Sequence, residues 1–194
     1  SRKRSGNIRD RDYVMRRDSG FTLIELMIAL ALVAILLATA VPALDDFTND
    51  ARQTGAINDF ISAIHLARNT AITTNSRVTM CASASGANCE AASWDSGWIV
   101  FGDLNSNGSL DVGETIVSAS AAAEGLNIQS GEFPVALMYR PNGRAMTNAL
   151  TGNSGEFTVC DFRGDEHAKV ILVELSGRPR MSETRANGAP PTCI

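Results

Sequence analysis

The hydropathy pattern is dominated by an apolar run near the start of the chain. Between Leu26 and Leu44 only Thr39 and Pro42 interrupt it. A run of this length is close to the ~20 residues that an α-helix needs to cross the hydrocarbon core of a bilayer. We therefore predict a membrane-spanning helix over residues 21–44.

Beyond this run the apolar residues continue with a helical period. They recur at spacings of three and four at Ala43, Leu44, Phe47, Ala51, Ala56, Ile57, Phe60, Ile61, Ile64, Ala67 and Ala71. This spacing predicts an amphipathic continuation of the helix over 45–75, whose apolar face lies on a folded domain. Because Pro42 lacks an N–H group, we expect the helix to kink or to melt locally there.

After Asn75 the pattern changes to short apolar runs separated by Gly, Asn, Asp and Ser. Such runs are typical of β-strands and turns. They fall at Arg77–Ala82, Gly97–Phe101, Glu114–Ser118, Val135–Arg140, Gly155–Asp161, Lys169–Leu175 and Arg178–Met181. Ala119–Gly125 is expected to be a loop or a helical turn. The predicted fold class is α+β, with a long N-terminal helix packed on an antiparallel, β-rich head over 76–194.

Charge predicts the orientation of the apolar run. Residues 1–20 hold seven Lys and Arg against three Asp, whereas Asp45, Asp46 and Asp50 follow the run. Positively charged flanks stay in the cytoplasm, so the N-terminus is expected inside and the head outside. An ordinary secretory signal would be cleaved after its apolar part, but here the sequence offers a cleavage site only before it.

One carboxylate, Glu25, interrupts the first turns of the apolar run. An ionised side chain inside a membrane costs roughly 2.5–3.5 kcal/mol on insertion scales. We therefore expect Glu25 to have a function. A plain membrane anchor, which is the alternative interpretation, explains neither Glu25 nor the junction between Gly20 and Phe21.

The segment Gly20-Phe21-Thr22-Leu23, together with Glu25 and Pro42, resembles the processing and assembly signal of type IV pilins and type II secretion pseudopilins. The resemblance implies that residues 1–20 are a leader. A prepilin peptidase of the inner membrane would cut after Gly20 and methylate the amine of Phe21. It also implies that Glu25 pairs with that amine on a neighbouring subunit. Met15 would begin a six-residue leader, with residues 1–14 either an upstream extension or a start-site artefact.

The head carries a second resemblance, to the GspH/FimT group of minor pilins and minor pseudopilins. Its motifs are Trp94-x-x-Gly97-Trp98-Ile99-Val100-Phe101, Asp103-x-Asn105-x-Asn107-Gly108, Tyr139-x-Pro141-x-Gly143, Phe157-x-Val159-Cys160 and Gly177-Arg178-Pro179-Arg180. The resemblance implies a type IV pilin-like fold, a single-pass protein of the Gram-negative inner membrane with a periplasmic head, other pilins as partners, and no catalytic activity. Two functions remain open: a minor pilin at the tip of a type IV pilus, and a GspH-type pseudopilin of type II secretion. The aromatic residues of these motifs are expected to pack in the core or in turns.

The tail motif suggests contact with DNA. In an extended segment Arg178 and Arg180 point to the same side, where two guanidinium groups can each bind a phosphate. FimT-type minor pilins implicated in DNA uptake have a similar tail, and Arg185 adds a third positive charge here. Residues 21–194 nevertheless hold ten Lys and Arg against eighteen Asp and Glu, a net charge of −8. Any DNA site must therefore be local, and the alternative is that these arginines pair with acidic neighbours or with a partner pilin.

A second candidate site is a polar loop with the spacing of a calcium-binding loop. Asp103, Asn105, Asn107, Ser109, Asp111 and Glu114 stand at positions 1, 3, 5, 7, 9 and 12 of an EF-hand-type pattern. In that pattern alternate oxygen ligands surround one cation. The flanks are predicted strands rather than helices, so the alternative is a hairpin loop without metal. The hypothesis is thus that the protein has no cofactor, or that it binds calcium here.

All four cysteines, Cys81, Cys89, Cys160 and Cys193, follow the apolar run. An even number in an exported domain predicts two disulfides. Three pairings are possible, and we favour the local pair Cys81–Cys89 together with Cys160–Cys193. Zinc is not indicated, since the chain has no Cys-x-x-Cys and both histidines lie far from any Cys pair.

The processing hypothesis gives a direct prediction. The mature protein should start at Phe21 with an N-methylated amine, which mass spectrometry of the N-terminal peptide from the membrane fraction will detect. A bulky residue in place of Gly20 should block the cut, whereas Gly20→Ala serves as the conservative control. An intact leader in cells that contain the peptidase would contradict the assignment.

Overall fold

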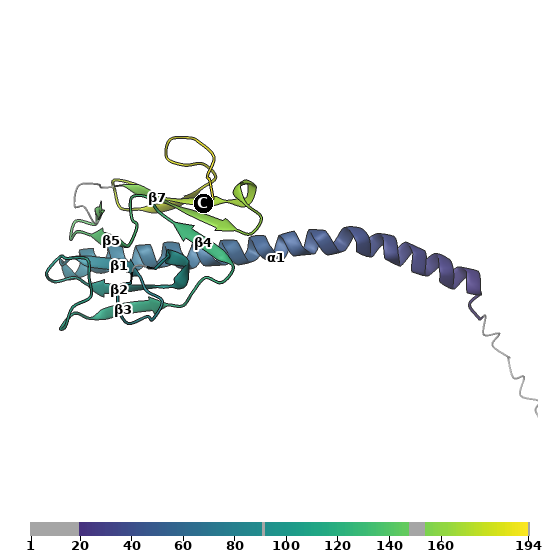
Figure 1. Ribbon diagram of the computed structural model, residues 1–194, viewed down its shortest axis with the longest axis horizontal. Helices are drawn as coiled ribbons and strands as arrows, with labels where there is room; N and C mark the ends of the chain where they lie inside the picture. The colour runs from purple at the N-terminus through teal and green to yellow at the C-terminus, as the bar shows by residue number, and fades with distance from the viewer. Residues whose placement is uncertain (1–19, 91, 148–153, 194) are drawn as a thin grey trace, which may run out of the picture. The chain divides into compact units, whose positions relative to one another are not determined.

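The computed structural model describes residues 20–90, 92–147 and 154–193 (Figure 1). The chain divides into two compact units, residues 1–46 and 47–194. All of the predicted leader except Gly20 lies outside the described residues.

The helix α1, Leu23–Thr74, contributes to both units. Its helical assignment continues through Pro42, so the helix does not melt there, and the other predicted outcome, a kink, stays a prediction. Proline removes one backbone hydrogen bond, and the helix-forming residues on both sides continue the helix despite that loss. From Ile57 onward α1 buries the face that its period predicted, including Phe60 and Ile64, whereas Phe47 and Ala51 of that predicted face are exposed.

The head contains two antiparallel sheets (Figure 1). Sheet A has the strand order β3-β2-β1-β5-β6, and sheet B has the order β4-β7-β8-β9. The strands of sheet A are β1 Val78–Ala82, β2 Trp98–Gly102, β3 Ile116–Ser120, β5 Ala136–Tyr139 and β6 Ala145–Met146. Those of sheet B are β4 Leu126–Gln129, β7 Gly155–Asp161, β8 Lys169–Val173 and β9 Pro179–Ser182.

Every predicted strand segment overlaps an observed strand, but β4 and β6 were not predicted. β4 is four residues long and β6 only two, too short for an alternating pattern to stand out from a loop. Ala119 and Ser120, predicted as part of a loop or turn, are instead the end of β3. The single-turn 3-10 helices η1, Trp94–Ser96, and η2, Asp165–His167, complete the head.

An aromatic cluster joins α1 to both sheets. The ring of Phe60 meets Trp98 and Phe157 edge-on at centroid distances of 4.9 Å, and Trp94 at 5.6 Å. The indole N–H of Trp94 donates to the carbonyl of Phe133 at 2.8 Å, so this buried polar group is satisfied. The predicted packing role of the motif aromatics is thereby confirmed.

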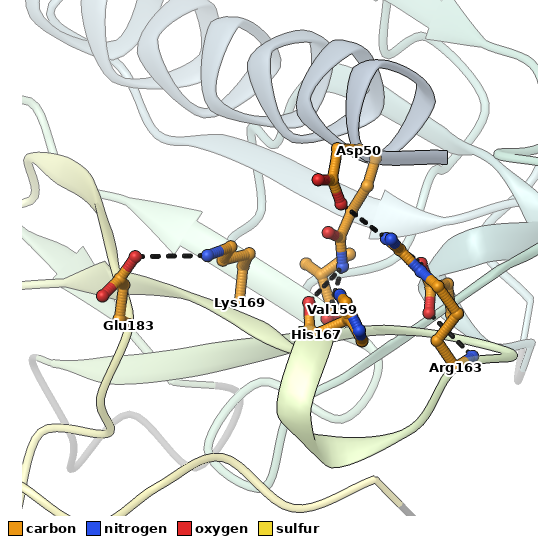
Figure 2. Close-up of polar contacts among 8 residues, drawn as sticks. Asp50, Val159, Arg163, His167, Lys169 and Glu183 are labelled. Carbon is orange, nitrogen blue, oxygen red and sulfur yellow. Dashed lines mark hydrogen bonds and ion pairs between the residues drawn. The ribbon is translucent and has the colours of Figure 1, made fainter. Parts of the chain in front are cut away.

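A polar contact fixes the same helix to sheet B at a different point. Gln53, only 2% exposed, lies on the buried face of α1. Its amide donates to the carbonyl oxygens of His167 at 3.0 Å and Val159 at 3.4 Å (Figure 2). A buried amide without partners would be costly, so this contact requires β7 and η2 to stay in register with α1.

One turn of helix earlier, an ion pair reinforces this attachment. The guanidinium group of Arg163 binds Asp50 on α1 at 2.8 Å and Asp161 on β7 at 2.7 Å (Figure 2). Burial alone would raise the pKa of Asp161, but hydrogen bonds from Arg163 outweigh it and hold that pKa below its usual value. Lys169 and Glu183 form a separate, more exposed pair at 3.3 Å.

The structure contains the disulfides Cys81–Cys89 and Cys160–Cys193, the two pairs favoured from the sequence. The second ties the C-terminal segment to β7. The backbone N–H of Cys193 also donates to the carboxylate of Asp165 at 2.7 Å. The end of the chain is therefore held on sheet B.

Two turns, β5–β6 and β8–β9, pack against each other and against α1. The guanidinium Nε of Arg68 donates to the carbonyls of Gly143 at 3.1 Å and Ser176 at 3.3 Å, one from each turn. The buried hydroxyl of Tyr139 donates to the carbonyl of Gly177 at 2.9 Å. Burial raises the pKa of Tyr139, so the phenol remains a donor at neutral pH. The motif Tyr139-x-Pro141-x-Gly143 and the motif that begins at Gly177 thus meet in this contact.

Gly177 is required at this contact for steric reasons. It has φ of +74°, and a Cβ there would overlap the carbonyl oxygen of Gly143 and lie 2.8 Å from a ring carbon of Tyr139. We expect Gly177→Ala to lower the free energy of unfolding by about 3 kcal/mol. Two costs add up to this value: roughly 1–2 kcal/mol for an alanine with left-handed backbone, and roughly 1–3 kcal/mol for overpacking by its Cβ. Urea unfolding of the detergent-solubilised chain, followed by the fluorescence of its buried tryptophans, measures this.

Gly188→Ala is the matched control. Gly188 has φ of +81°, and an added Cβ would have no neighbour within 4 Å, so only the backbone cost of roughly 1–2 kcal/mol applies. Equal losses for the two variants would show that the turn contact does not require glycine at position 177.

Candidate functional site

The predicted processing and assembly residues lie at the start of α1. Gly20 and Phe21 precede the helix, and the ring of Phe21 is 84% exposed. The hydroxyl of Thr22 accepts a hydrogen bond from the backbone N–H of Glu25 at 3.2 Å, which is a typical N-terminal cap. Glu25 therefore stands in the first turn of the helix, where a carboxylate interacts favourably with the helix dipole.

The helix that follows is apolar on all its sides. Leucine, isoleucine and valine side chains from Leu23 to Leu44 are each at least half exposed. Among the described helices, α1 alone is long and apolar enough to cross a membrane, judged by length and composition. This surface fits a lipid environment or a bundle of similar helices, and not an aqueous one.

The acidic loop between β2 and β3 is closed by its own hydrogen bonds. The buried carboxylate of Asp103 accepts from the hydroxyl of Thr79 at 2.7 Å and from the N–H groups of Gly108 at 3.0 Å and Asn107 at 3.1 Å. One oxygen of Asp111 accepts from the side-chain amides of Asn105 and Asn107, both at 2.7 Å.

Glu114 completes the loop by accepting from the N–H groups of Leu104 at 2.8 Å and Asp111 at 3.0 Å. Ser109 donates its N–H to the side chain of Asn107 at 2.8 Å. No group of three or more His, Cys, Asp or Glu side chains in the described part of the chain is placed to hold a metal ion. Calcium binding therefore stays a prediction from the sequence.

The same loop covers the outer face of sheet A. Leu110 packs on a small buried cluster formed by Cys81, Ile99, Phe101 and Ala136. Ser106 and Gly108 adopt left-handed backbone, with φ of 65° and 75°. The hairpin-loop alternative is thus sufficient to explain why Asn and Gly occur here.

The tail arginines share one face of sheet B, as the extended spacing predicted. Arg178 and Arg180 are exposed while Pro179 between them is buried. In the register of the sheet, Arg180 lies opposite Leu172, which lies opposite Glu156 on β7. Arg185, in the segment after β9, reaches this same face by binding Glu156.

Acidic partners neutralise two of these three arginines. Arg180 binds Glu174 at 2.8 Å. Arg185 binds the nearly buried carboxylate of Glu156, an interaction that raises the pKa of Arg185. Arg178 is the one tail arginine for which the described residues supply no carboxylate. The predicted alternative, pairing with acidic neighbours, therefore applies to Arg180 and Arg185.

Gln53 and Arg163, through which α1 is attached beside sheet B, were not among the residues predicted from the sequence. The signal for Gln53 was present, because it occupies a position of the buried helical face one turn before Ile57. A single polar residue at an apolar position is a candidate for a buried hydrogen bond. Nothing local to Arg163 indicated that it would bind Asp50, which is 113 residues away.

Comparisons with known families match both parts of the chain. The model of the family described as type II transport protein GspH matches residues 56–177. The model described as the prokaryotic N-terminal methylation motif matches residues 15–41. Two curated fimbrial proteins of Pseudomonas aeruginosa are 43% identical over 58 residues, which is 30% of this chain and 37% of theirs. The match thus spans little more than a third of the length of these relatives.

Two solved structures share the fold. Both are crystal structures of the type IV minor pilin FimU of Pseudomonas aeruginosa strain PAO1. They superpose with TM-scores of 0.57 and 0.55 at 18% and 17% identity, and cover 76% and 73% of this chain and 99% of each FimU chain. The predicted pilin-like α+β fold is confirmed.

The geometry of the acidic loop predicts which carboxylate stabilises it. Asp103→Asn should lower the free energy of unfolding by about 1–3 kcal/mol, because one oxygen that accepts buried hydrogen bonds becomes a donor. Asp111→Asn should cost less than about 1 kcal/mol, since water can replace its exposed contacts. Urea unfolding of both variants measures this, and equal losses would contradict it.

The same unfolding assay tests the calcium hypothesis. Calcium that binds only the folded chain should raise the unfolding midpoint as its concentration increases, and Asp111→Asn should abolish that rise. No change in the midpoint up to millimolar calcium would exclude a functional site in this loop.

Proposed function

This chain belongs to the GspH family and carries an N-terminal methylation motif, and on that premise we propose that it is a minor pilin incorporated into a type IV pilus. Membership implies assembly with other pilins and association with a membrane. The family is one of structural subunits, and the proposal includes no catalytic activity.

The observation that carries this proposal is the first half of α1, whose large apolar side chains are exposed and which holds one charged residue between Leu23 and Leu44, Glu25. Helices in lipid gain little hydrophobic free energy from contact with one another. A specific polar contact is therefore needed to align them. We propose that Glu25 pairs with the free amine of Phe21 on the neighbouring subunit and sets the axial register of the bundle.

The proposal includes maturation and location. A prepilin peptidase removes the leader after Gly20 and methylates Phe21. The subunit then spans the inner membrane once, with its N-terminus in the cytoplasm and its head in the periplasm. The disulfides Cys81–Cys89 and Cys160–Cys193 support this location, since such bonds persist in the oxidising periplasm.

A GspH-type pseudopilin of type II secretion is the second candidate. The match of the head to the GspH family model favours it. The fold shared with FimU and the 43% identity to fimbrial proteins favour the pilus. Deleting the gene distinguishes the two: loss of surface pili supports the first, and loss of secreted enzymes with normal pili supports the second.

We extend the proposal to a position at the tip and to weak DNA binding without sequence preference. Arg178, which is exposed and forms no ion pair with a carboxylate of the described residues, supports this extension, whereas Arg180 and Arg185 are already paired. With a net charge of −8 over residues 21–194, binding must be local and weak. Calcium is not part of the proposal, because the loop carboxylates already accept hydrogen bonds within the loop.

The assembly role of Glu25 is testable by substitution. Glu25→Val should leave membrane insertion intact, or improve it, because a charge is removed from the span. Incorporation into filaments should fall at least tenfold, since the register-setting pair is lost. Immunoblots of sheared fibres and of the membrane fraction measure the two quantities separately.

Glu25→Gln serves as the matched variant, with the same length and no charge. If the charge sets the register, Gln should be as defective as Val. Wild-type amounts of either variant in the fibres would refute the role assigned to Glu25.

A further inference from the structure

We propose that the main phosphate-binding surface of this subunit is a row of arginines across sheet A, namely Arg77, Arg140 and Arg144, extended by Arg178 from sheet B. We call these four residues the arginine row. The inference rests on the DNA-binding part of the proposed function and places the contact away from the C-terminal tail. Its ligand class is the sugar-phosphate backbone of nucleic acid.

The register of sheet A aligns the first three members. Val78 of β1 lies opposite Tyr139 of β5, which lies opposite Ala145 of β6, and all three side chains belong to the core. Arg77 and Arg140 are the next positions along β1 and β5. Arg144, whose carbonyl accepts from the N–H of Arg140 at 3.0 Å, is the next position along β6. Because side chains alternate between the faces of a sheet, these three point to the face away from the core.

This arrangement is unfavourable in the isolated subunit. Directly opposed side chains on neighbouring strands lie about 5 Å apart, and like charges there destabilise a sheet. Within the described residues no carboxylate forms an ion pair with Arg77, Arg140 or Arg144. By contrast, Arg163, Arg180 and Arg185 each bind an acidic side chain. An anionic ligand would relieve the repulsion within the row.

On sheet A, the acidic residue next to the row in register is Asp103, which directly follows β2 and donates its N–H to the carbonyl of Arg77 at 3.0 Å. Its carboxylate is buried and accepts three hydrogen bonds, from Thr79, Asn107 and Gly108. It is therefore engaged in holding its own loop, and the exposed charge at this end of sheet A is positive. On sheet B, Glu174 lies opposite Arg178 and binds Arg180.

The packed turns bring Arg178 to the row. A Cβ added at Gly177, immediately before it, would meet the carbonyl oxygen of Gly143 and the backbone nitrogen of Ala145, so Gly177 lies beside the backbone on both sides of Arg144. Arg68 links the β5–β6 turn and the β8–β9 turn by donating a hydrogen bond to a carbonyl of each. The spacing between Arg144 and Arg178 is thus set by tertiary contacts, which preorganises the surface for an extended polyanion.

The distribution of charge supports the same assignment. Of the ten cationic side chains in residues 21–194, five lie at this end of the head: Arg68, Arg77, Arg140, Arg144 and Arg178. Guanidinium groups bind phosphate bidentately, which suits a ligand with regularly spaced phosphates. The remaining surface carries the excess of negative charge and would repel DNA, so contact is confined to the row.

The test compares DNA binding by the full chain in uncharged detergent micelles, using a fluorescent duplex of random sequence at several salt concentrations. The row variant is Arg140→Gln with Arg144→Gln. Its charge-matched control is Arg52→Gln with Lys169→Gln, which removes two cations elsewhere on the head. Losing two phosphate contacts should flatten the slope of log Kd against log salt by about 1.8, at about 0.9 per contact. The control should keep the wild-type slope.

Two further variants sharpen the assignment. Arg140→Lys with Arg144→Lys keeps the charge and should retain most of the salt dependence. Arg180→Gln with Arg185→Gln breaks two tail ion pairs and should leave binding near that of the control. Near-UV circular dichroism must match wild type for every variant compared.

The outcomes separate this inference from the proposed function. If wild type does not bind DNA at low salt, the DNA-binding part of the proposed function fails, and the inference fails with it. If wild type binds while the row variant behaves like the control, or if the tail variant loses as much as the row variant, only the inference is overturned. Normal DNA binding by a row variant that is missing from sheared fibres would also overturn it, and would identify the row as a contact with another subunit.

Discussion

The burial of one face of α1 against both sheets is the constraint on which the rest of the head depends. Phe60 contacts Trp98 of sheet A and Phe157 of sheet B, so a single side chain links all three layers. Removing it would leave a large cavity at the point where the helix and the two sheets meet. The two sheets are therefore held in one domain because they pack on the same helix.

Polar contacts then fix the position of the helix along that face. Gln53 binds the backbone of η2, and Asp50 binds Arg163 in the turn before η2 (Figure 2). Arg68 binds the two packed turns four helical turns later. Apolar packing is tolerant of small shifts, whereas hydrogen bonds to buried carbonyls are not. Together they fix the register of the two sheets against the part of α1 that belongs to the head, residues 47–74.

The first half of α1 and the head differ in the chemistry of their side chains. The first half of α1 offers an apolar surface with the carboxylate of Glu25 in its first turn, and this composition suits contact with other helices in lipid. The head carries the disulfides and most of the charge. Most of its cations are either paired, as Arg163 and Arg180 are, or gathered at one end, as Arg140 and Arg144 are. Cations gathered at one place on an acidic protein point to a function in binding.

Periodicity in the sequence determined the long helix, its buried face around Phe60 and most strands, because burial repeats along an element and leaves a pattern. The tertiary structure alone decided which polar groups meet. Gln53 with His167, and Arg180 with Glu174, are pairings that depend on the register of strands and on contacts between distant segments. β4 and β6 were not predicted because they are too short to show a periodic pattern. A sequence records which residues avoid water, but a hydrogen bond or ion pair requires two specific atoms about 3 Å apart, and only the folded chain sets that distance.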